Sequence, residues 1–142
     1  MRVMPQKLLT ITLVGLILLT TGCGEKGPGL IPVRGKVTYG GGAWPKAGKI
    51  NFNPVEPAAG FPRLNGTADL ATDGSFVVQS TGDKMGLVPG KYQVVIECWE
   101  TLPSMETNQP GSSYLPGNFQ QEVEIKVGEK SKDVSFDVPK KM

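Results

Sequence analysis

The side chains best able to do chemistry in this 142-residue chain are its two cysteines, Cys23 and Cys98. A thiol can act as a nucleophile, a metal ligand, half of a disulfide or a site of covalent modification. The chain has no histidine, which removes the usual general base, the usual zinc ligand and any Ser-His-Asp or Cys-His arrangement. We therefore predict a protein that is not an enzyme and that uses no cofactor or metal.

Cys23 follows a segment typical of an export signal. Arg2 and Lys7 make a basic start without acidic residues, and residues 8–19 are almost wholly apolar. This is the plan of a secretory signal peptide, and the apolar run is shorter than the ~20 residues that a membrane-spanning helix needs. The alternatives are an ordinary secretory signal, in which Cys23 has no special role, and a retained membrane helix, which is less favoured.

The stretch LTTGC, residues 19–23, resembles the lipobox of bacterial lipoproteins, where cleavage occurs just before a cysteine that carries a diacylglyceryl thioether. Thr20 stands where that family usually has leucine. The resemblance implies a signal peptide over residues 1–22 and lipid attachment at Cys23, with acyl groups such as palmitate. It also implies a protein anchored in the cell membrane or outer membrane and facing the periplasm or the exterior.

The charge of the chain belongs mainly to the predicted signal. The formal net charge is +2, from 15 basic and 13 acidic residues, and removal of Arg2 and Lys7 leaves the two kinds equal in number. No polybasic segment remains to indicate nucleic acid or anionic lipid as a partner. We expect the protein to meet the membrane through its lipid, and a glycan, a peptide or an envelope protein is the candidate ligand.

Residues 23–32 are rich in glycine and proline and show no periodicity, which is typical of a flexible linker. From residue 24 to residue 32 such a linker reaches about 30 Å when extended. We place the folded domain at residues 33–139.

Seven runs of alternating apolar and polar residues follow, separated by turn signals such as Asp73-Gly74 and Pro89-Gly90. Alternation with period two is typical of half-buried β-strands. The runs lie at 33–39, 49–53, 64–70, 75–79 and 91–99, and around 123–127 and 134–138. They predict an all-β fold, a single antiparallel seven-stranded β-sandwich.

The run 91–99 makes two further predictions. Tyr92 is placed to bury its ring and bring its hydroxyl to the backbone, as in a tyrosine corner. Cys98 falls on the same inward face, and a buried cysteine behaves as a small inert hydrophobe. Pairing of Cys98 with Cys23 is disfavoured if the sulfur of Cys23 is acylated.

Two connections, 40–48 and 100–118, are longer than ordinary turns. Trp44 lies in the first connection. Trp99 immediately precedes the second connection, and Tyr114 lies within it. Long loops at the end of a sandwich often carry binding surfaces, and an exposed aromatic ring can serve as a platform for a glycan or peptide. These three aromatics are the candidate ligand-contacting residues. The alternative is that they cap the sandwich and have a structural role.

Two other residue sets are weaker candidates. Asp69, Asp73 and Asp83 match no dense calcium-binding loop, and turn formation explains Asp73 better. Lys36 and Asp137 hold positions that suggest an intramolecular isopeptide bond, but alternation places both on the solvent side of their strands. Such a bond needs apolar surroundings.

The order of four motifs resembles the carboxypeptidase regulatory-like domain, a transthyretin-like sandwich found on small bacterial lipoproteins. The motifs are VRGKVTY from residue 33, GTADLATDGSFVV from residue 66, GLVPGKYQVVIE from residue 86 and VEIKVGEKSKDVSFDV from residue 123. The resemblance implies a Greek-key fold and a noncatalytic binding or structural module of the bacterial cell envelope. The alternative that it implies is an accessory or regulatory subunit of a secreted or envelope enzyme.

Overall fold

The computed structural model describes residues 29–80, 82, 84–117 and 119–142, which form strands and no helix. The predicted signal peptide, Cys23 and most of the predicted linker lie outside these residues. The strands are β1 (Val33–Tyr39), β2 (Gly48–Pro57), β3 (Gly66–Leu70), β4 (Ser75–Val77), β5 (Gln79–Ser80), β6 (Lys84–Met85), β7 (Gly90–Glu97), β8 (Trp99–Thr101), β9 (Ser112–Ser113), β10 (Gln121–Ile125) and β11 (Lys132–Val138). The prediction of an all-β fold is confirmed.

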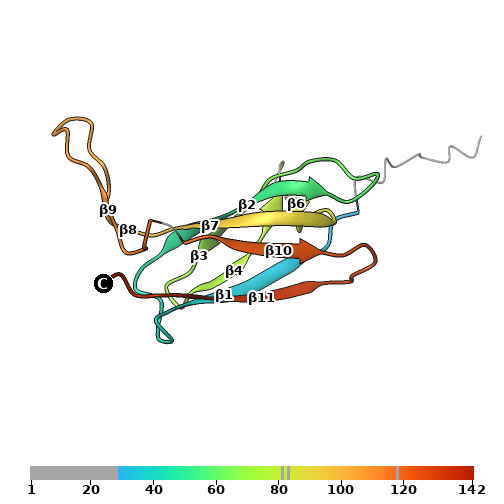
Figure 1. The fold of residues 1–142 in the computed structure, drawn as a ribbon, viewed down its shortest axis with the longest axis horizontal. Coiled ribbons are helices and arrows are strands. Elements are labelled where there is room, and N and C mark those ends of the chain that lie inside the picture. The colour runs from blue at the N-terminus through green and yellow to red at the C-terminus, as the bar shows by residue number, and fades with distance from the viewer. Residues whose placement is uncertain (1–28, 81, 83, 118) are drawn as a thin grey trace, which may run out of the picture.

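Two sheets form the body of the molecule (Figure 1). One has three strands in the order β11-β1-β4, and the other has six in the order β10-β7-β2-β3-β5-β6. A further two-stranded sheet, β8-β9, extends from one end of the body. The strands outnumber the predicted runs partly because breaks divide two of those runs, 75–79 into β4 and β5, and 91–99 into β7 and β8.

The core lies between the two larger sheets and is built from the inward residues of the alternating runs. In β7, Tyr92 and Val94 are buried between more exposed neighbours. The rings of Phe76 and Phe136 stack with centroids 6.4 Å apart in the smaller sheet, and Phe76 lies 6.1 Å from the Phe52 ring of the larger one. Burial of these apolar groups is the dominant favourable contribution to folding.

The first and last strands, β1 and β11, pair in parallel. This corrects the prediction of a wholly antiparallel sandwich. The register runs from Val33 opposite Lys132 to Tyr39 opposite Val138, while β4 pairs with the other edge of β1 in antiparallel fashion. Alternation indicates which residues face the core, but it carries no information about which strands are neighbours or in which direction they run.

The run 75–79 passes from one sheet to the other. Its first part, β4, pairs with β1, and its second part, β5, pairs with β3 and β6. Val78, at the crossing, is fully buried. Its N–H donates to the Val33 carbonyl, and its carbonyl accepts from the Gly86 N–H. One alternating run therefore serves both sheets.

Two local predictions agree with the structure. Gly74 has a φ of +84°, and Asp73 accepts hydrogen bonds from the hydroxyl and N–H of Ser75, which lower the pKa of the Asp73 carboxyl. The Tyr92 hydroxyl donates a buried 2.7 Å hydrogen bond to the Val88 carbonyl, so the tyrosine corner is confirmed. Burial raises the pKa of Tyr92 to about 12.

The turn between β10 and β11 begins earlier than the alternation indicates. The predicted run extends to Val127, but this residue is 66% exposed because β10 ends at Ile125. Gly128, with a φ of +88°, then reverses the chain. The alternation therefore predicts burial correctly at Val123 and Ile125, where the sheet continues, and fails at Val127, beyond its end.

The two ends of the body differ (Figure 1). At one end, the base, Ile31 is buried and pairs with Leu87, and the Pro32 carbonyl accepts from the Lys132 N–H. Ile31 therefore belongs to the folded body, although the predicted linker extended to residue 32. The opposite end carries the C-terminus and the arm, which we define as residues 99–113. The base consists of residues 29–32, 55–64, 84–91 and 124–132.

Candidate functional site

Trp44 lies in the core. Its side chain is 3% exposed, and its ring meets the Tyr39 ring edge-on with centroids 6.3 Å apart. Gly40 and Gly41 both have positive φ, so the chain after β1 turns sharply before Trp44 folds over the end of the core. Among the described residues, the indole Nε1 has no hydrogen-bond partner. Trp44 thus matches the structural alternative, since a ligand in solvent cannot reach its ring.

Tyr114 fastens the arm to the body. Its ring is half-buried and packs against the core. Its N–H donates to the Cys98 carbonyl at 3.1 Å, and its carbonyl accepts a 3.0 Å hydrogen bond from the Tyr39 hydroxyl. The next residue, Leu115, is buried. The contacts of Tyr114 are therefore those of a structural residue at the root of the arm.

Trp99 is the most exposed of the three predicted aromatics, at 37%. It lines a shallow depression of about 450 Å³ with Lys46, Glu97 and Leu102 among its neighbours. Trp99 is paired with Ser113 across the arm. Trp44 is buried and Tyr114 packs against the core, so the three aromatics do not form one exposed platform.

The arm is an ordered hairpin. The hydroxyls of Thr101 and Ser112 are 2.7 Å apart, and the Ser112 hydroxyl also donates to the Glu100 carboxylate at 3.3 Å. Nearer the tip, Ser104 and Gln109 exchange main-chain hydrogen bonds of 3.1 and 3.2 Å. Hydrogen bonds thus hold the arm along its length while it extends beyond the two sheets (Figure 1).

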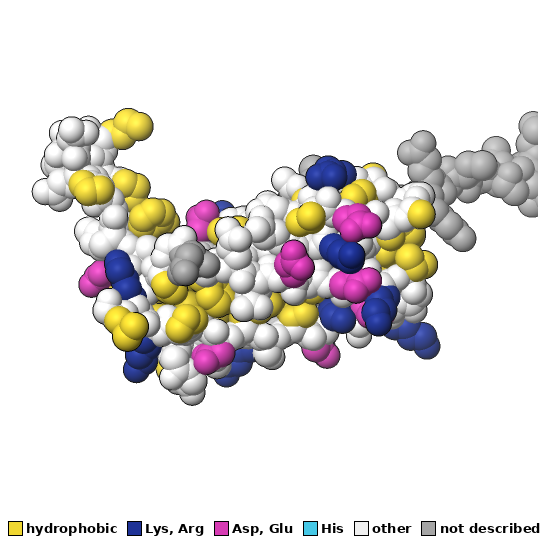
Figure 2. Space-filling model, viewed as in Figure 1, with side chains coloured by type: hydrophobic (Ala, Val, Ile, Leu, Met, Phe, Trp, Pro, Cys, Tyr) yellow, Lys and Arg dark blue, Asp and Glu magenta, His cyan; other side chains and the backbone are white. Residues whose placement is uncertain are grey.

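Large apolar side chains on the arm face solvent. Leu102 is 72% exposed and Met105 is fully exposed. Figure 2 shows hydrophobic side chains along the arm, away from the body. With Trp99, these residues form what we call the apolar arm residues. The sequence reasoning did not single out Leu102 or Met105, although large apolar residues in a long, proline-containing loop were a usable signal.

The arm is also acidic. It contains Glu100 and Glu106, and no lysine or arginine occurs between residues 98 and 120. The nearest cations around the Trp99 depression are Lys46 and Lys49, which belong to the body. The arm therefore presents apolar side chains in a negatively charged setting.

Cys98 is buried, as predicted. Its side chain is 1% exposed, and its Sγ lies 3.5 Å from the Lys46 carbonyl. Burial raises the pKa of the Cys98 thiol, with a smaller opposing effect from the Lys46 charge. A high pKa and lack of access both suppress thiolate chemistry.

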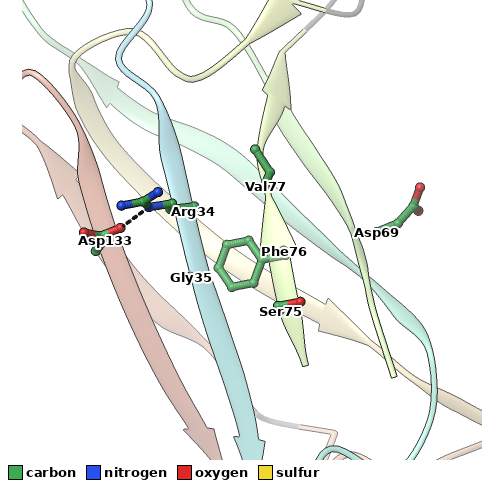
Figure 3. A pocket seen from close by; sticks show the side chains of 7 residues that line it. All are labelled: Arg34, Gly35, Asp69, Ser75, Phe76, Val77 and Asp133. Carbon is green, nitrogen blue, oxygen red and sulfur yellow. Dashed lines mark hydrogen bonds and ion pairs between the residues drawn. The ribbon is translucent and has the colours of Figure 1, made fainter. Parts of the chain in front are cut away.

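A depression beside β1 offers no convergent chemistry (Figure 3). Arg34 Nε donates to Asp133 Oδ1 at 2.8 Å, and both side chains are exposed. Asp69, on the other side of the depression, points away from that pair in Figure 3. Phe76 fills the space between them. An exposed ion pair of this kind contributes little to stability, and these side chains do not converge on a common point.

The other predicted residue sets are also dispersed. Within the part of the chain that the structure describes, no three His, Cys, Asp or Glu side chains form a metal-binding group. Asp83 lies outside that part. Lys36 and Asp137 are both exposed, as their parity predicts. Asp137 accepts from the Thr38 hydroxyl and the Gly41 N–H, which lower the pKa of the Asp137 carboxyl.

No protein-family model, curated protein or solved structure matches this chain. Among the described residues there is no helix long and apolar enough to cross a membrane.

Proposed function

We propose that this protein is a lipid-anchored, noncatalytic module of the bacterial cell envelope that binds a protein partner through its arm. The basic start, the apolar run and the LTTGC stretch support cleavage after residue 22 and lipid attachment at Cys23. Two or three acyl chains on one cysteine hold a protein stably on a bilayer, where a single chain does not.

We also propose that the body is a carboxypeptidase regulatory-like, Greek-key sandwich extended by short additional strands. The order of the four sequence motifs supports this assignment, as do the two sheets that enclose one core. Such sandwiches host many functions, so the functional part of the proposal depends on the arm.

The position and surface of the arm carry the proposal. The chain enters the body at the base, and the arm projects from the opposite end (Figure 1). An anchor attached ahead of the base would therefore leave the arm pointing away from the membrane. The apolar arm residues Trp99, Leu102 and Met105 would then be free to meet a partner in the envelope.

The side chains of the arm favour a protein over a glycan. Aromatic residues and methionine are enriched in protein interfaces, and an ordered, exposed hairpin with Leu102 and Met105 presents flexible apolar groups rather than a flat ring platform. Glu100 and Glu106 add negative charge. A partner surface with an apolar pocket and basic residues around it would complement this arm.

An accessory or regulatory subunit of a secreted or envelope enzyme is the second candidate, because such a subunit would use the same arm. Recovery of one enzyme in stoichiometric amount with the anchored protein, together with a change in its activity, would distinguish this role from a structural one.

The anchor is tested by the intact mass of the protein extracted from membranes. We expect a chain that begins at Cys23 and is heavier than its sequence by the mass of the attached lipid. A mass that matches an unmodified chain would overturn the anchor.

The arm is tested by photo-crosslinking in intact cells. A benzophenone amino acid at Met105 should give a discrete adduct, and one at Val77, which is 51% exposed on β4, should not. The additional change Leu102→Ser should reduce the yield at position 105 because it removes an apolar contact. Equal adducts from positions 105 and 77, or none from the arm, would contradict a role in partner binding.

A further inference from the structure

The base carries more cations than carboxylates among the described residues. The cations are Arg63, Lys84, Lys91, Lys126, Lys130 and Lys132, and the carboxylates are Glu56, Glu124 and Glu129. Glu56 pairs with Lys91 at 3.3 Å, and Glu129 pairs with Lys132 at 3.6 Å. Lys126 and Lys130, exposed in the turn between β10 and β11, form no ion pair with another described residue.

The opposite end, taken together with the arm, lacks this excess of cations. Its carboxylates are Asp69, Asp73, Glu97, Glu100, Glu106 and Asp137, against Lys36, Lys46, Lys49, Lys140 and Lys141. Figure 2 shows dark blue side chains at both ends of the visible face, with the larger group at the end that holds the base. A chain whose predicted mature form has no net charge is therefore polarised along its length.

Exposed apolar side chains accompany the cations of the base. Val127 is 66% exposed beside Lys126, and Met85 is 48% exposed beside Lys84. Val127 also borders a depression with Pro57 and Ala58 at the end of β2. Lysines next to exposed apolar residues are typical of surfaces that lie in the interfacial region of a membrane.

The proposed anchor would hold this surface close to a bilayer. Gly29 is six residues after Cys23, so the chain between them spans at most about 20 Å. Glu25 and Lys26 cancel in charge, and this short segment therefore adds no net charge of its own. The anchor would therefore keep the base within about 20 Å of the lipid headgroups.

We propose that the base docks directly on an anionic phospholipid bilayer, with Lys126 and Lys130 near the headgroups and Val127 in the interfacial region. The inference rests on the proposed lipid anchor at Cys23. Each lysine near an anionic surface strengthens association about fivefold, and tethering converts docking into an intramolecular step. Docking would fix the orientation of the body and keep the arm directed outward.

The experiment uses the full protein, processed in a bacterial host, purified from its membrane and reconstituted in vesicles of phosphatidylcholine with or without phosphatidylglycerol. An environment-sensitive fluorophore is attached at Val127→Cys, or at Met105→Cys on the arm as control. Cys98 is buried and should not compete for the label. We expect quenching by headgroup-labelled lipid at position 127 only, and stronger quenching with phosphatidylglycerol present.

Charge variants make the test specific. Lys126→Gln with Lys130→Gln should weaken docking about fivefold for each lysine, and added salt should do the same. The matched control, Lys140→Gln with Lys141→Gln at the opposite end, should leave the signal unchanged. Both control residues are exposed.

Intact mass, measured on the same sample, separates the two proposals. Acylated Cys23 with a probe at position 127 that stays in water would overturn docking and leave the anchor in place. Docking that is indifferent to the Lys126 and Lys130 changes would overturn the electrostatic contact. An unmodified Cys23 would overturn the anchor and, with it, the tethered docking.

Discussion

The hydroxyl of Tyr39 donates a 3.0 Å hydrogen bond to the main-chain carbonyl of Tyr114. The same oxygen accepts a 3.3 Å hydrogen bond from the Lys141 N–H. The last residue of β1 is thereby linked to the root of the arm and to the C-terminal segment. The direction in which the arm projects is thus set by contacts with the body.

Tyr39→Phe should loosen the root of the arm. The change removes the donor to the Tyr114 carbonyl and should lower the free energy of unfolding by about 1 kcal/mol. Hydrogen exchange should increase at residues 112–115 more than in β7. Tyr114→Phe is the control, because the main chain of Tyr114 makes this hydrogen bond, and it should leave that exchange pattern in place. Unchanged exchange in Tyr39→Phe would contradict the assignment.

Tyr92→Phe should destabilise the body. The buried hydroxyl donates to the Val88 carbonyl at 2.7 Å, and its loss leaves that carbonyl without its partner. An unsatisfied buried acceptor costs about 1–3 kcal/mol. Urea denaturation of the wild type and of Tyr92→Phe measures the difference in stability. Equal midpoints would exclude a stabilising role for the hydrogen bond between Tyr92 and Val88.

The stability of the wild type should also fall at high pH through Tyr92. Burial favours the neutral phenol and raises its pKa from about 10 to about 12 in the folded protein. The contribution of the neutral Tyr92 phenol to the free energy of unfolding is therefore fully present below pH 10 and is lost as the pH rises toward 12. Subtracting the profile of Tyr92→Phe isolates this residue, and a difference that is flat across the interval would disprove the predicted linkage.

Gly35→Ala should disrupt the pairing of β1 with β11. A Cβ at this position would overlap the Val134 carbonyl and lie 2.8 Å from Cζ of Phe76. Overpacking of this kind costs about 1–3 kcal/mol. Gly117→Ala, where an added Cβ has nothing within 4 Å, should change stability little. Thermal unfolding of both variants tests the contact, and equal melting temperatures would refute it.

Cys98 should resist thiol reagents until the protein unfolds. Its side chain is 1% exposed and burial raises its pKa, so modification by a disulfide reagent should be slow in buffer and fast in denaturant. The rate should follow the population of unfolded protein as urea is raised. Rapid labelling of the folded protein would contradict the burial of this thiol.

Local patterns were sufficient for much of the body. Alternation identified the buried faces of β1 and β7, Asp73-Gly74 marked a turn, and Pro89-Gly90 with Tyr92 marked a corner, because each feature depends on residues a few positions apart. The burial of Cys98 followed from the same parity. The LTTGC stretch predicts lipid attachment at Cys23, which lies outside the described residues.

The tertiary structure decided the remaining features, because they depend on residues far apart in the chain. The parallel pairing of β1 with β11 joins the two ends of the domain, and no local period encodes a neighbour or a direction. Burial separated Trp44 from Trp99, two loop tryptophans that look alike in sequence, since one packs against Tyr39 and the other begins an arm outside the core. Folding also gathered lysines from separate loops at the base, which a count of charges along the chain cannot reveal.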